Sequence, residues 1–367
     1  MSEVFYRKYR PKNFSEFIGQ EHIVKTLTNA IANDMISHAY LFSGPRGTGK
    51  TTLARIFAKA VNCQNRKKGE YEPCNECSSC VEISEGRSID LIEIDAASHR
   101  GIDEVRELRE GIRFVPSKSK YKVYIIDEAH QITRDAANAL LKTLEEPPPF
   151  VIFILATTEV HKMIPTILSR CQRFDFRKLK VPEILKKLRM ISEKERIKIK
   201  KEALELIALN SEGSMRDAES LLDQVFALFG EKEIEAKDIK ELLGIVETKT
   251  VQEFTNFLLE KKVKEAIGFL NSLIERGIDL KEFTKTELKY LRQIMVFKIM
   301  GEKGNPYLIG LTNEEIQKLK EHSLKIDEKG LEKALSLFLD AQNKIRFSPI
   351  PQLPLELAII EFCERID

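Results

Sequence analysis

The sequence carries almost no net charge. Its 59 Lys and Arg residues balance 57 Asp and Glu residues, which leaves a formal charge of +2 over 367 residues. Histone-like and polybasic nucleic-acid binders show a large positive charge in sequence alone, so the composition excludes that class. A basic patch on one face remains compatible with these totals.

Long apolar runs are also lacking. The longest, residues 150–156, is far shorter than the roughly 18 to 20 residues that a membrane-spanning helix needs. The basic residues at the start of the chain, such as Arg7 and Lys8, are not followed by the apolar segment of a secretory signal. We therefore expect a cytoplasmic protein without a membrane partner.

The patterns that are present divide the chain into three zones, and its length exceeds that of one ordinary core. Before residue 178, helical patterns alternate with five short apolar runs: 39–43, 91–95, 123–127, 150–157 and 173–176. This alternation predicts an α/β domain over 1–178 with a buried parallel sheet of five strands. Helical spacing then predicts a small helical domain over 179–242 and a second all-helical domain over 243–367.

A glycine-rich stretch follows the first predicted strand and precedes a predicted helix, 52–62. It fits the P-loop pattern and comprises Gly44, Pro45, Arg46, Gly47, Thr48, Gly49, Lys50 and Thr51. Glycines let backbone N–H groups turn toward phosphates, Lys50 would reach the β- and γ-phosphates, and Thr51 would offer its hydroxyl to Mg²⁺. A chance glycine turn is the alternative, but strand, loop and helix all agree with the motif.

Two adjacent carboxylates end the predicted strand 123–127. Asp127 would hold Mg²⁺, and Glu128 would orient and deprotonate an attacking water. An acidic pair at a strand end is often simply solvated, so alone it decides little. Combined with the P-loop, it predicts hydrolysis of a phosphoanhydride.

Four of the six cysteines crowd into residues 63–80, namely Cys63, Cys74, Cys77 and Cys80. Four thiolates with no nearby histidine match a closed tetrahedral Zn²⁺ site, which is structural because no position remains for water. An iron–sulfur cluster and four free thiols are the alternatives. We favour zinc because no downstream Cys-Pro completes the ferredoxin pattern.

Together, the P-loop, Asp127-Glu128-Ala129-His130, Ser169-Arg170-Cys171 and the four cysteines resemble the bacterial DNA polymerase III gamma/tau subunits, the motors of the AAA+ sliding-clamp loader. The likeness covers the whole chain. It implies an AAA+ P-loop domain with a zinc-binding insertion, a helical lid, and an all-α collar that assembles subunits into a hetero-oligomeric ring. It also implies the cofactors ATP, Mg²⁺ and Zn²⁺, and an ATPase within the polymerase holoenzyme that has no polymerase active site.

The resemblance gives further residues a role. Thr158 corresponds to sensor 1 near the γ-phosphate, and Arg216 to sensor 2 of the lid. Arg170 corresponds to the arginine finger that acts on ATP held by a neighbouring subunit; arginines at such positions are otherwise most often surface ion pairs. The family's adenine pocket maps onto Tyr6, Arg10, Pro11 and Ile18, where the sequence alone suggests only a basic amphipathic lead-in.

The implied function is clamp loading: ATP binding opens and loads the sliding clamp on primed DNA, and hydrolysis releases it. The implied partners are the delta and delta prime subunits, further gamma/tau copies, the clamp, and primer–template DNA held by its backbone. Arg100, in the stretch 98–101 before a helix predicted near Ile102, could meet a phosphate, although a solvated helix start is equally compatible. The basic run 186–202 is predicted to be a solvated helix face.

Two other functions share part of this motif set. A hexameric AAA+ DNA motor, such as the Holliday-junction branch migrator, lacks this cysteine insertion and usually ends in a winged-helix domain. A non-hydrolysing clamp-loader stator subunit has no need to retain Lys50, Thr51, Asp127 and Glu128 together. Members of the tau type continue past the collar into further domains, so we expect either a short gamma form or a shortened tau.

Overall fold

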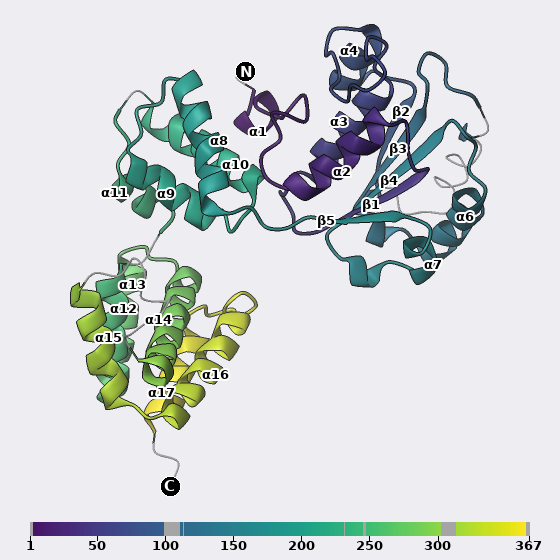
Figure 1. The fold of residues 1–367 in the computed structure, drawn as a ribbon. Helices are drawn as coiled ribbons and strands as arrows, with labels where there is room; N and C mark the ends of the chain where they lie inside the picture. The colour runs from purple at the N-terminus through teal and green to yellow at the C-terminus, as the bar shows by residue number, and fades with distance from the viewer. Residues whose placement is uncertain are drawn as a thin grey trace. The chain divides into compact units, whose positions relative to one another are not determined.

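The computed structural model describes residues 3–98, 111–112, 114–230, 232–244, 247–301 and 313–364. The chain divides into two compact units, residues 1–236 and 237–367. Figure 1 traces the first unit from the purple N-terminus to the teal helices and the second from green to yellow. No helix within the described ranges is long and apolar enough to cross a bilayer.

A five-stranded sheet forms the centre of the first unit. Its strands are β1 (Ala39–Ser43), β2 (Leu91–Asp95), β3 (Lys122–Asp127), β4 (Val151–Thr157) and β5 (Gln172–Asp175), in the order β2-β3-β4-β1-β5. Every pairing is parallel, so the carboxyl ends of the strands share one edge. The predicted parallel sheet of five strands is confirmed, and the edge is where α/β folds bind ligands.

Helices cover both faces of the sheet, as the strand burial requires. On one face, α2 (Glu21–Ala32) and α3 (Lys50–Val61) share a core with Tyr40 and Phe42 of β1. On the other, α6 (Arg134–Glu145) and α7 (Pro165–Leu168) share a core with Leu41. The first unit also contains α4 (Ser78–Ser84), which packs against α3, and the 3₁₀ turns η1 (Ala129–Gln131) and η2 (Val160–Lys162).

A small helical bundle completes the first unit, with α8 (Val181–Lys194), α9 (Lys201–Asn210) and α10 (Met215–Phe229). The short N-terminal helix α1 (Phe5–Lys8) packs on this bundle, where the rings of Phe5 and Phe226 stack with centroids 5.9 Å apart. The predicted helical character of this region is confirmed, and Ile199 and Ile234 add one isolated parallel β-bridge.

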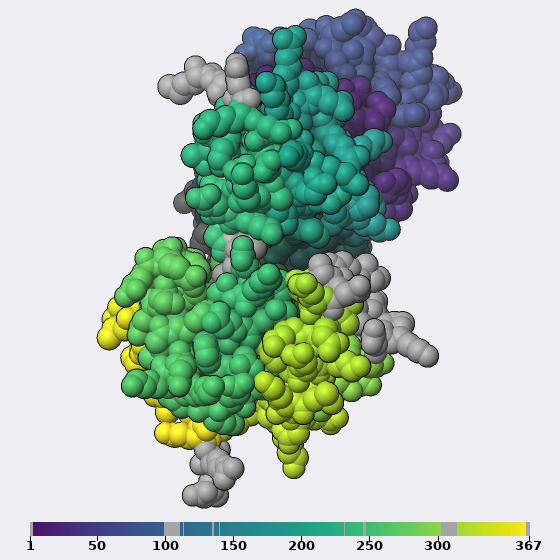
Figure 2. All heavy atoms as spheres, turned by 90° about the vertical axis from the view of Figure 1, so that its left-hand side faces the viewer, coloured from purple at the N-terminus to yellow at the C-terminus, as the bar shows by residue number. Residues whose placement is uncertain are grey.

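The second unit is all-helical in its described part. After α11 (Ala236–Leu242), which bridges the unit boundary, its helices are α12 (Thr248–Leu259), α13 (Val263–Glu275), α14 (Leu280–Met300), α15 (Asn313–Lys325), α16 (Glu328–Ile345) and α17 (Leu353–Cys363). The green to yellow side chains pack into one dense body in Figure 2. At its centre, the Phe254 ring meets the edges of Phe283 and Phe338, with centroids 5.0 Å and 6.0 Å away.

Candidate functional site

The P-loop joins β1 to α3, and hydrogen bonds within the loop hold its lysine against its own backbone. Gly47 and Gly49 adopt φ values of +75° and +97°, which side chains other than glycine rarely reach. The buried Lys50 amine donates hydrogen bonds to the carbonyl oxygens of Gly44 (2.8 Å) and Pro45 (2.9 Å). Burial lowers the pKa of Lys50, while nearby Glu128 and Asp127 oppose that shift. The lysine is thus held over the loop that would cradle a triphosphate.

The acidic pair lies beside the P-loop, as its position at the end of β3 predicts. The Thr51 hydroxyl donates to Oδ2 of Asp127 at 2.7 Å, which brings the two predicted Mg²⁺ ligands together. Glu128 adopts a left-handed conformation, with φ of +48°, and its Oε2 accepts a hydrogen bond from Thr158 Oγ1 at 3.0 Å. One carboxylate therefore faces the P-loop threonine and the other faces the predicted sensor threonine.

The sequence did not predict a role for one neighbour of this acidic pair, His130. His130 lies 2.9 Å through Nδ1 from the Thr157 hydroxyl and 3.5 Å from Oε2 of Glu128. Its place two residues after Glu128 was visible in the sequence, but only the 3₁₀ turn η1 swings it back toward the end of β4. His130 is therefore a further group that can orient the Glu128 carboxylate.

Helix α10 supplies the other wall of the site. The Met215 N–H donates a 3.0 Å hydrogen bond to the Gly47 carbonyl oxygen. In the same turn, the Arg216 guanidinium lies over the Tyr6 ring, 4.9 Å from its centroid, a cation–π arrangement. Burial lowers the pKa of Arg10, and the Arg55 charge adds to that effect. The N-terminal segment and the helical bundle thus approach the P-loop from the same side.

One cavity gathers nearly all of the predicted nucleotide-site residues. Those lining it are Tyr6, Arg10, Pro11, Ile18, Arg46, Gly47, Thr48, Gly49, Lys50, Thr51, Asp127, Glu128, Thr158 and Arg216. Sequence reasoning missed seven other lining residues: Glu16, Phe17, Thr52, Leu179, Lys187, Met215 and Glu219. Lys187 and Glu219 are far from the P-loop in the sequence, so only the folded structure shows that they line the cavity.

Lys187 is the exception in the basic run 186–202, whose other basic residues are exposed as predicted. Its side chain is buried, and its amine donates a hydrogen bond to the Tyr9 carbonyl oxygen at 2.8 Å. The run is also split, since α8 ends at Lys194 and α9 begins at Lys201. The other DNA candidates, His99, Arg100, Gly101 and the helix near Ile102, lie outside the described residues.

Arg170 lies apart from the cavity that the other predicted residues line. It follows α7, where its guanidinium donates to the Thr166 carbonyl oxygen at 2.7 Å and pairs with Glu145 of α6. The side chain is 31% exposed. Arg170 therefore cannot be assigned to the nucleotide of its own chain, and a role there needs a neighbouring subunit.

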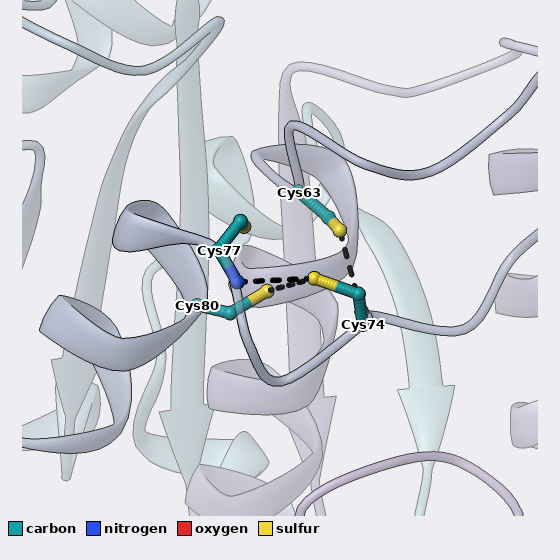
Figure 3. A group of neighbouring side chains, drawn as sticks. All are labelled: Cys63, Cys74, Cys77 and Cys80. Atoms are coloured by element: carbon teal, nitrogen blue, oxygen red, sulfur yellow. Dashed lines mark hydrogen bonds between the residues drawn. The ribbon is translucent and has the colours of Figure 1, made fainter.

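The four clustered cysteines converge on one point. The sulfur atoms of Cys63, Cys74, Cys77 and Cys80 all lie within 4.8 Å of one another, and Figure 3 shows the sulfurs of Cys63, Cys74 and Cys80 pointing toward each other. The Cys74 and Cys80 sulfurs are 3.9 Å apart, close to the roughly 3.8 Å edge of a tetrahedron with Zn–S bonds of about 2.3 Å. The set fits a zinc ion.

Main-chain donors support this arrangement. The N–H groups of Glu76 and Cys77 point at the Cys74 sulfur from 3.4 Å and 3.3 Å. Although burial opposes the effect, these donors lower the pKa of the Cys74 thiol to about 6. A thiol that ionises this readily is ready to act as a metal ligand, because the thiolate is the coordinating form.

Three family models match successive parts of the chain. The model described as DNA polymerase III, delta subunit, matches residues 19–180. The model of the DNA polymerase III clamp loader subunit, ATPase lid domain, matches residues 183–231. The model of DNA polymerase III subunits gamma and tau domain III matches residues 234–367.

A solved structure of a variant of RuvB from Thermotoga maritima is similar in fold. It superposes with a TM-score of 0.50 at 20% identity, over 78% of this chain and 92% of that one. At this identity the likeness establishes a similar fold and nothing beyond it.

Curated relatives extend the similarity along the sequence. The tau subunit of DNA polymerase III from Bacillus subtilis is 42% identical over 99% of this chain, and the gamma/tau subunit from Mycoplasma genitalium is 46% identical over 78%. The chain spans 63% and 47% of the lengths of these two proteins. The gamma subunit from Buchnera aphidicola subsp. Schizaphis graminum is 38% identical over 98% of this chain and 97% of its own length. The chain belongs to the gamma/tau subunit family of DNA polymerase III.

Proposed function

We propose that this chain is the ATPase motor subunit of a DNA polymerase III clamp loader. The observation that carries the proposal is the meeting, in one cavity, of the P-loop lysine, two carboxylates with their threonine partners, and an arginine from α10. Residues 1–178 would hold the nucleotide, 179–242 would form the lid, and 243–367 would form the collar. ATP binding would open and load the sliding clamp, and hydrolysis would release it.

Each group in the cavity has a task in phosphoanhydride hydrolysis. Lys50 would neutralise the β- and γ-phosphate oxygens, and backbone N–H groups of the P-loop would hold them in place. Glu128, oriented by Thr158, would take a proton from the attacking water as the bond between the β- and γ-phosphates breaks. Arg216 would draw the lid toward the same phosphates. ADP and phosphate leave as the products.

The residues also fit two metals. Thr51 and Asp127, joined at 2.7 Å, would hold Mg²⁺, which supplies positive charge against the developing charge on the phosphates. Cys63, Cys74, Cys77 and Cys80 would hold Zn²⁺ in a closed set of four sulfurs. That site is structural, because it leaves no ligand position for a substrate.

The proposed partners follow the family. The collar would join this chain to delta, delta prime and further gamma/tau copies in a ring, which would engage the sliding clamp and the backbone of primer–template DNA. Nucleotide can drive this assembly only as far as it binds the loading-competent ring better than the relaxed one. In this ring, Arg170 would leave Glu145 and reach the ATP of its neighbour.

Reconstitution tests the proposal. The chain is mixed with delta, delta prime, the sliding clamp and primed DNA, and clamp loading is followed with ATP. We expect Lys50→Ala to assemble normally but to load no clamp, whereas Lys25→Ala, at an exposed position on α2, loads normally. A Lys50→Ala complex that loads clamps at the wild-type rate would overturn the proposal, as would a chain that never joins these partners.

The role of Arg170 has its own test in the same complex. An arginine finger is worth roughly 10³ to 10⁵ in rate, so Arg170→Ala should lower clamp- and DNA-stimulated ATPase by at least about a hundredfold. ATP binding by the isolated chain should not change. Arg173→Ala is the control, because Arg173 pairs with Asp175 of the same strand at 2.8 Å. Unchanged stimulated ATPase in Arg170→Ala would exclude the role in trans.

The two alternatives find no support in the described site. The RuvB likeness extends to the fold only, and the cysteine set is that of the clamp-loader resemblance. A stator subunit would not need the paired Thr51 and Asp127 or the paired Thr158 and Glu128.

A further inference from the structure

Two buried charged residues of the helical bundle line the nucleotide cavity without a task in hydrolysis. Lys187 of α8 and Glu219 of α10 are each 5% exposed, and both contribute to the cavity wall. Removing a charge from water is costly unless another group compensates it. Their presence in the wall therefore calls for an explanation.

The two residues differ in their hydrogen bonding, although Lys187 and Arg10 place positive charge near the Glu219 carboxylate. The Lys187 amine donates to the Tyr9 carbonyl oxygen at 2.8 Å. Within the described part of the chain, the Glu219 carboxylate receives no hydrogen bond and forms no ion pair within 4.0 Å. Burial raises the pKa of Glu219 to about 7, while Lys187 and Arg10 pull it the other way. A nearly buried carboxylate thus borders the cavity with its hydrogen-bonding capacity unused.

The position of Glu219 in the cavity indicates which part of a nucleotide it could contact. Met215 touches the P-loop through its 3.0 Å hydrogen bond to Gly47. Glu219 lies four residues further along the same face of α10, which is about 6 Å along the helix axis. If the triphosphate occupies the P-loop, the base of the nucleotide must occupy the remainder of the cavity.

Apolar and aromatic side chains supply part of the cavity lining. Beside the charged and polar residues already named, its lining includes Tyr6, Pro11, Phe17, Ile18, Leu179 and Met215. Such walls bind a flat ring by contact area, whereas the few polar groups among them fix the orientation and identity of the ligand. Glu219 is the acidic residue of this wall that is nearly buried, so it is placed to read the edge of a base.

We propose that Glu219 selects adenine nucleotides by accepting a hydrogen bond from the exocyclic amine of the base. Lys187, held by Tyr9, keeps a positive charge beside the carboxylate and so favours its ionised, accepting form. Guanine carries a carbonyl oxygen where adenine carries the amine, and that oxygen would face the carboxylate and be repelled. The inference rests on the proposed function, because it assumes that the cavity holds a nucleoside triphosphate.

Nucleotide binding by the full chain tests the inference, with ATP, GTP and purine riboside triphosphate, which lacks the amine. A hydrogen bond to a charged group implies that the wild type prefers ATP to the amine-free analogue by about tenfold or more. In Glu219→Leu, the affinity for ATP should fall to that for the analogue. The affinity for the analogue itself should stay within about twofold of the wild-type value. In Glu219→Gln, whose amide can donate, discrimination against GTP should fall.

Two controls make the outcome decisive. Asp223→Asn changes the next carboxylate on α10, which does not line the cavity, and should leave the ratio of ATP to analogue unchanged. Thermal unfolding verifies that Glu219→Leu folds. A Glu219→Leu chain that keeps the wild-type ratio, or a wild type with no preference for ATP over the analogue, overturns the inference alone. A wild type that binds none of the three triphosphates overturns the proposed function itself.

Discussion

The main-chain N–H of Met215 donates a 3.0 Å hydrogen bond to the carbonyl oxygen of Gly47. This bond joins the first turn of α10 to the middle of the P-loop, across more than 160 residues of sequence. Because Arg216 follows directly and lies over Tyr6, the contact also sets the position of the predicted sensor arginine. This hydrogen bond therefore couples the nucleotide loop to the helical bundle.

Gly47→Ala should break this coupling. The glycine has a φ of +75°, and a methyl group there would collide with the Ser214 hydroxyl. We expect the affinity for ATP to fall at least about tenfold, measured by titration calorimetry, because α10 can no longer close on the loop. Gly69→Ala is the matched control, since Gly69 has a φ of +89° but open space around it. It should cost about 1 kcal/mol of stability and leave ATP binding intact; equal ATP affinity in both variants would contradict the account.

The cysteine cluster makes a prediction about metal content. We expect one zinc ion per chain by elemental analysis, lost in Cys77→Ser together with at least about 5 °C of melting temperature, because metal binding is coupled to folding. Cys171→Ser is the control, since Cys171 lies outside the cluster and should keep the zinc. Visible absorption typical of iron–sulfur clusters, or full zinc content in Cys77→Ser, would show that the assignment is wrong.

A buried carboxylic acid in the second unit predicts a pH dependence of stability. Glu287 is fully buried, and burial raises its pKa from 4.5 to about 8, although Thr255 opposes the shift. The Thr255 hydroxyl lies 2.8 Å from the Val251 carbonyl oxygen and 2.9 Å from Glu287 Oε1. Because its one proton satisfies Val251, which can only accept, a protonated Glu287 would donate to the Thr255 oxygen.

The raised pKa means that the folded chain binds a proton that the unfolded chain releases above about pH 4.5. The contribution of Glu287 to stability is therefore full below that pH, declines as the pH rises, and is lost above about pH 8. We compare the free energies of unfolding of wild type and Glu287→Gln, measured in urea. Between pH 5 and 8, the wild type should lose up to about 1.4 kcal/mol per pH unit relative to the variant. A difference that does not change with pH would mean that Glu287 is ionised in the folded chain.

The parts of the fold and site that the sequence predicted are those with local signals. The five strands alternate with helices over short distances, and the P-loop, Asp127-Glu128 and the cysteines each sit within a few residues of a strand or helix end. Their partners in space, such as Thr51 with Asp127, followed from the parallel sheet, which aligns strand ends at one edge.

What the sequence did not predict depends on contacts between distant segments. Lys187 reads as one member of a basic run, and only the carbonyl of Tyr9 explains its burial. Glu219 reads as an ordinary helix residue until α10 is placed against the P-loop. The N-terminal segment reads as basic and amphipathic, but the stacking of Phe5 on Phe226 ties it to the helical bundle. No local pattern encodes these three contacts.

Single-turnover hydrolysis of ATP by the assembled complex containing Glu128→Gln tests the central claim most directly. Glutamine keeps the shape of Glu128 and can still meet the Thr158 hydroxyl, which lies 3.0 Å from Oε2, but it cannot take a proton from water. The account predicts ATP affinity within about twofold of wild type and hydrolysis slowed by about 10² to 10⁴. Hydrolysis at the wild-type rate would contradict it, because the carboxylate at the end of β3 would then have no part in cleaving ATP.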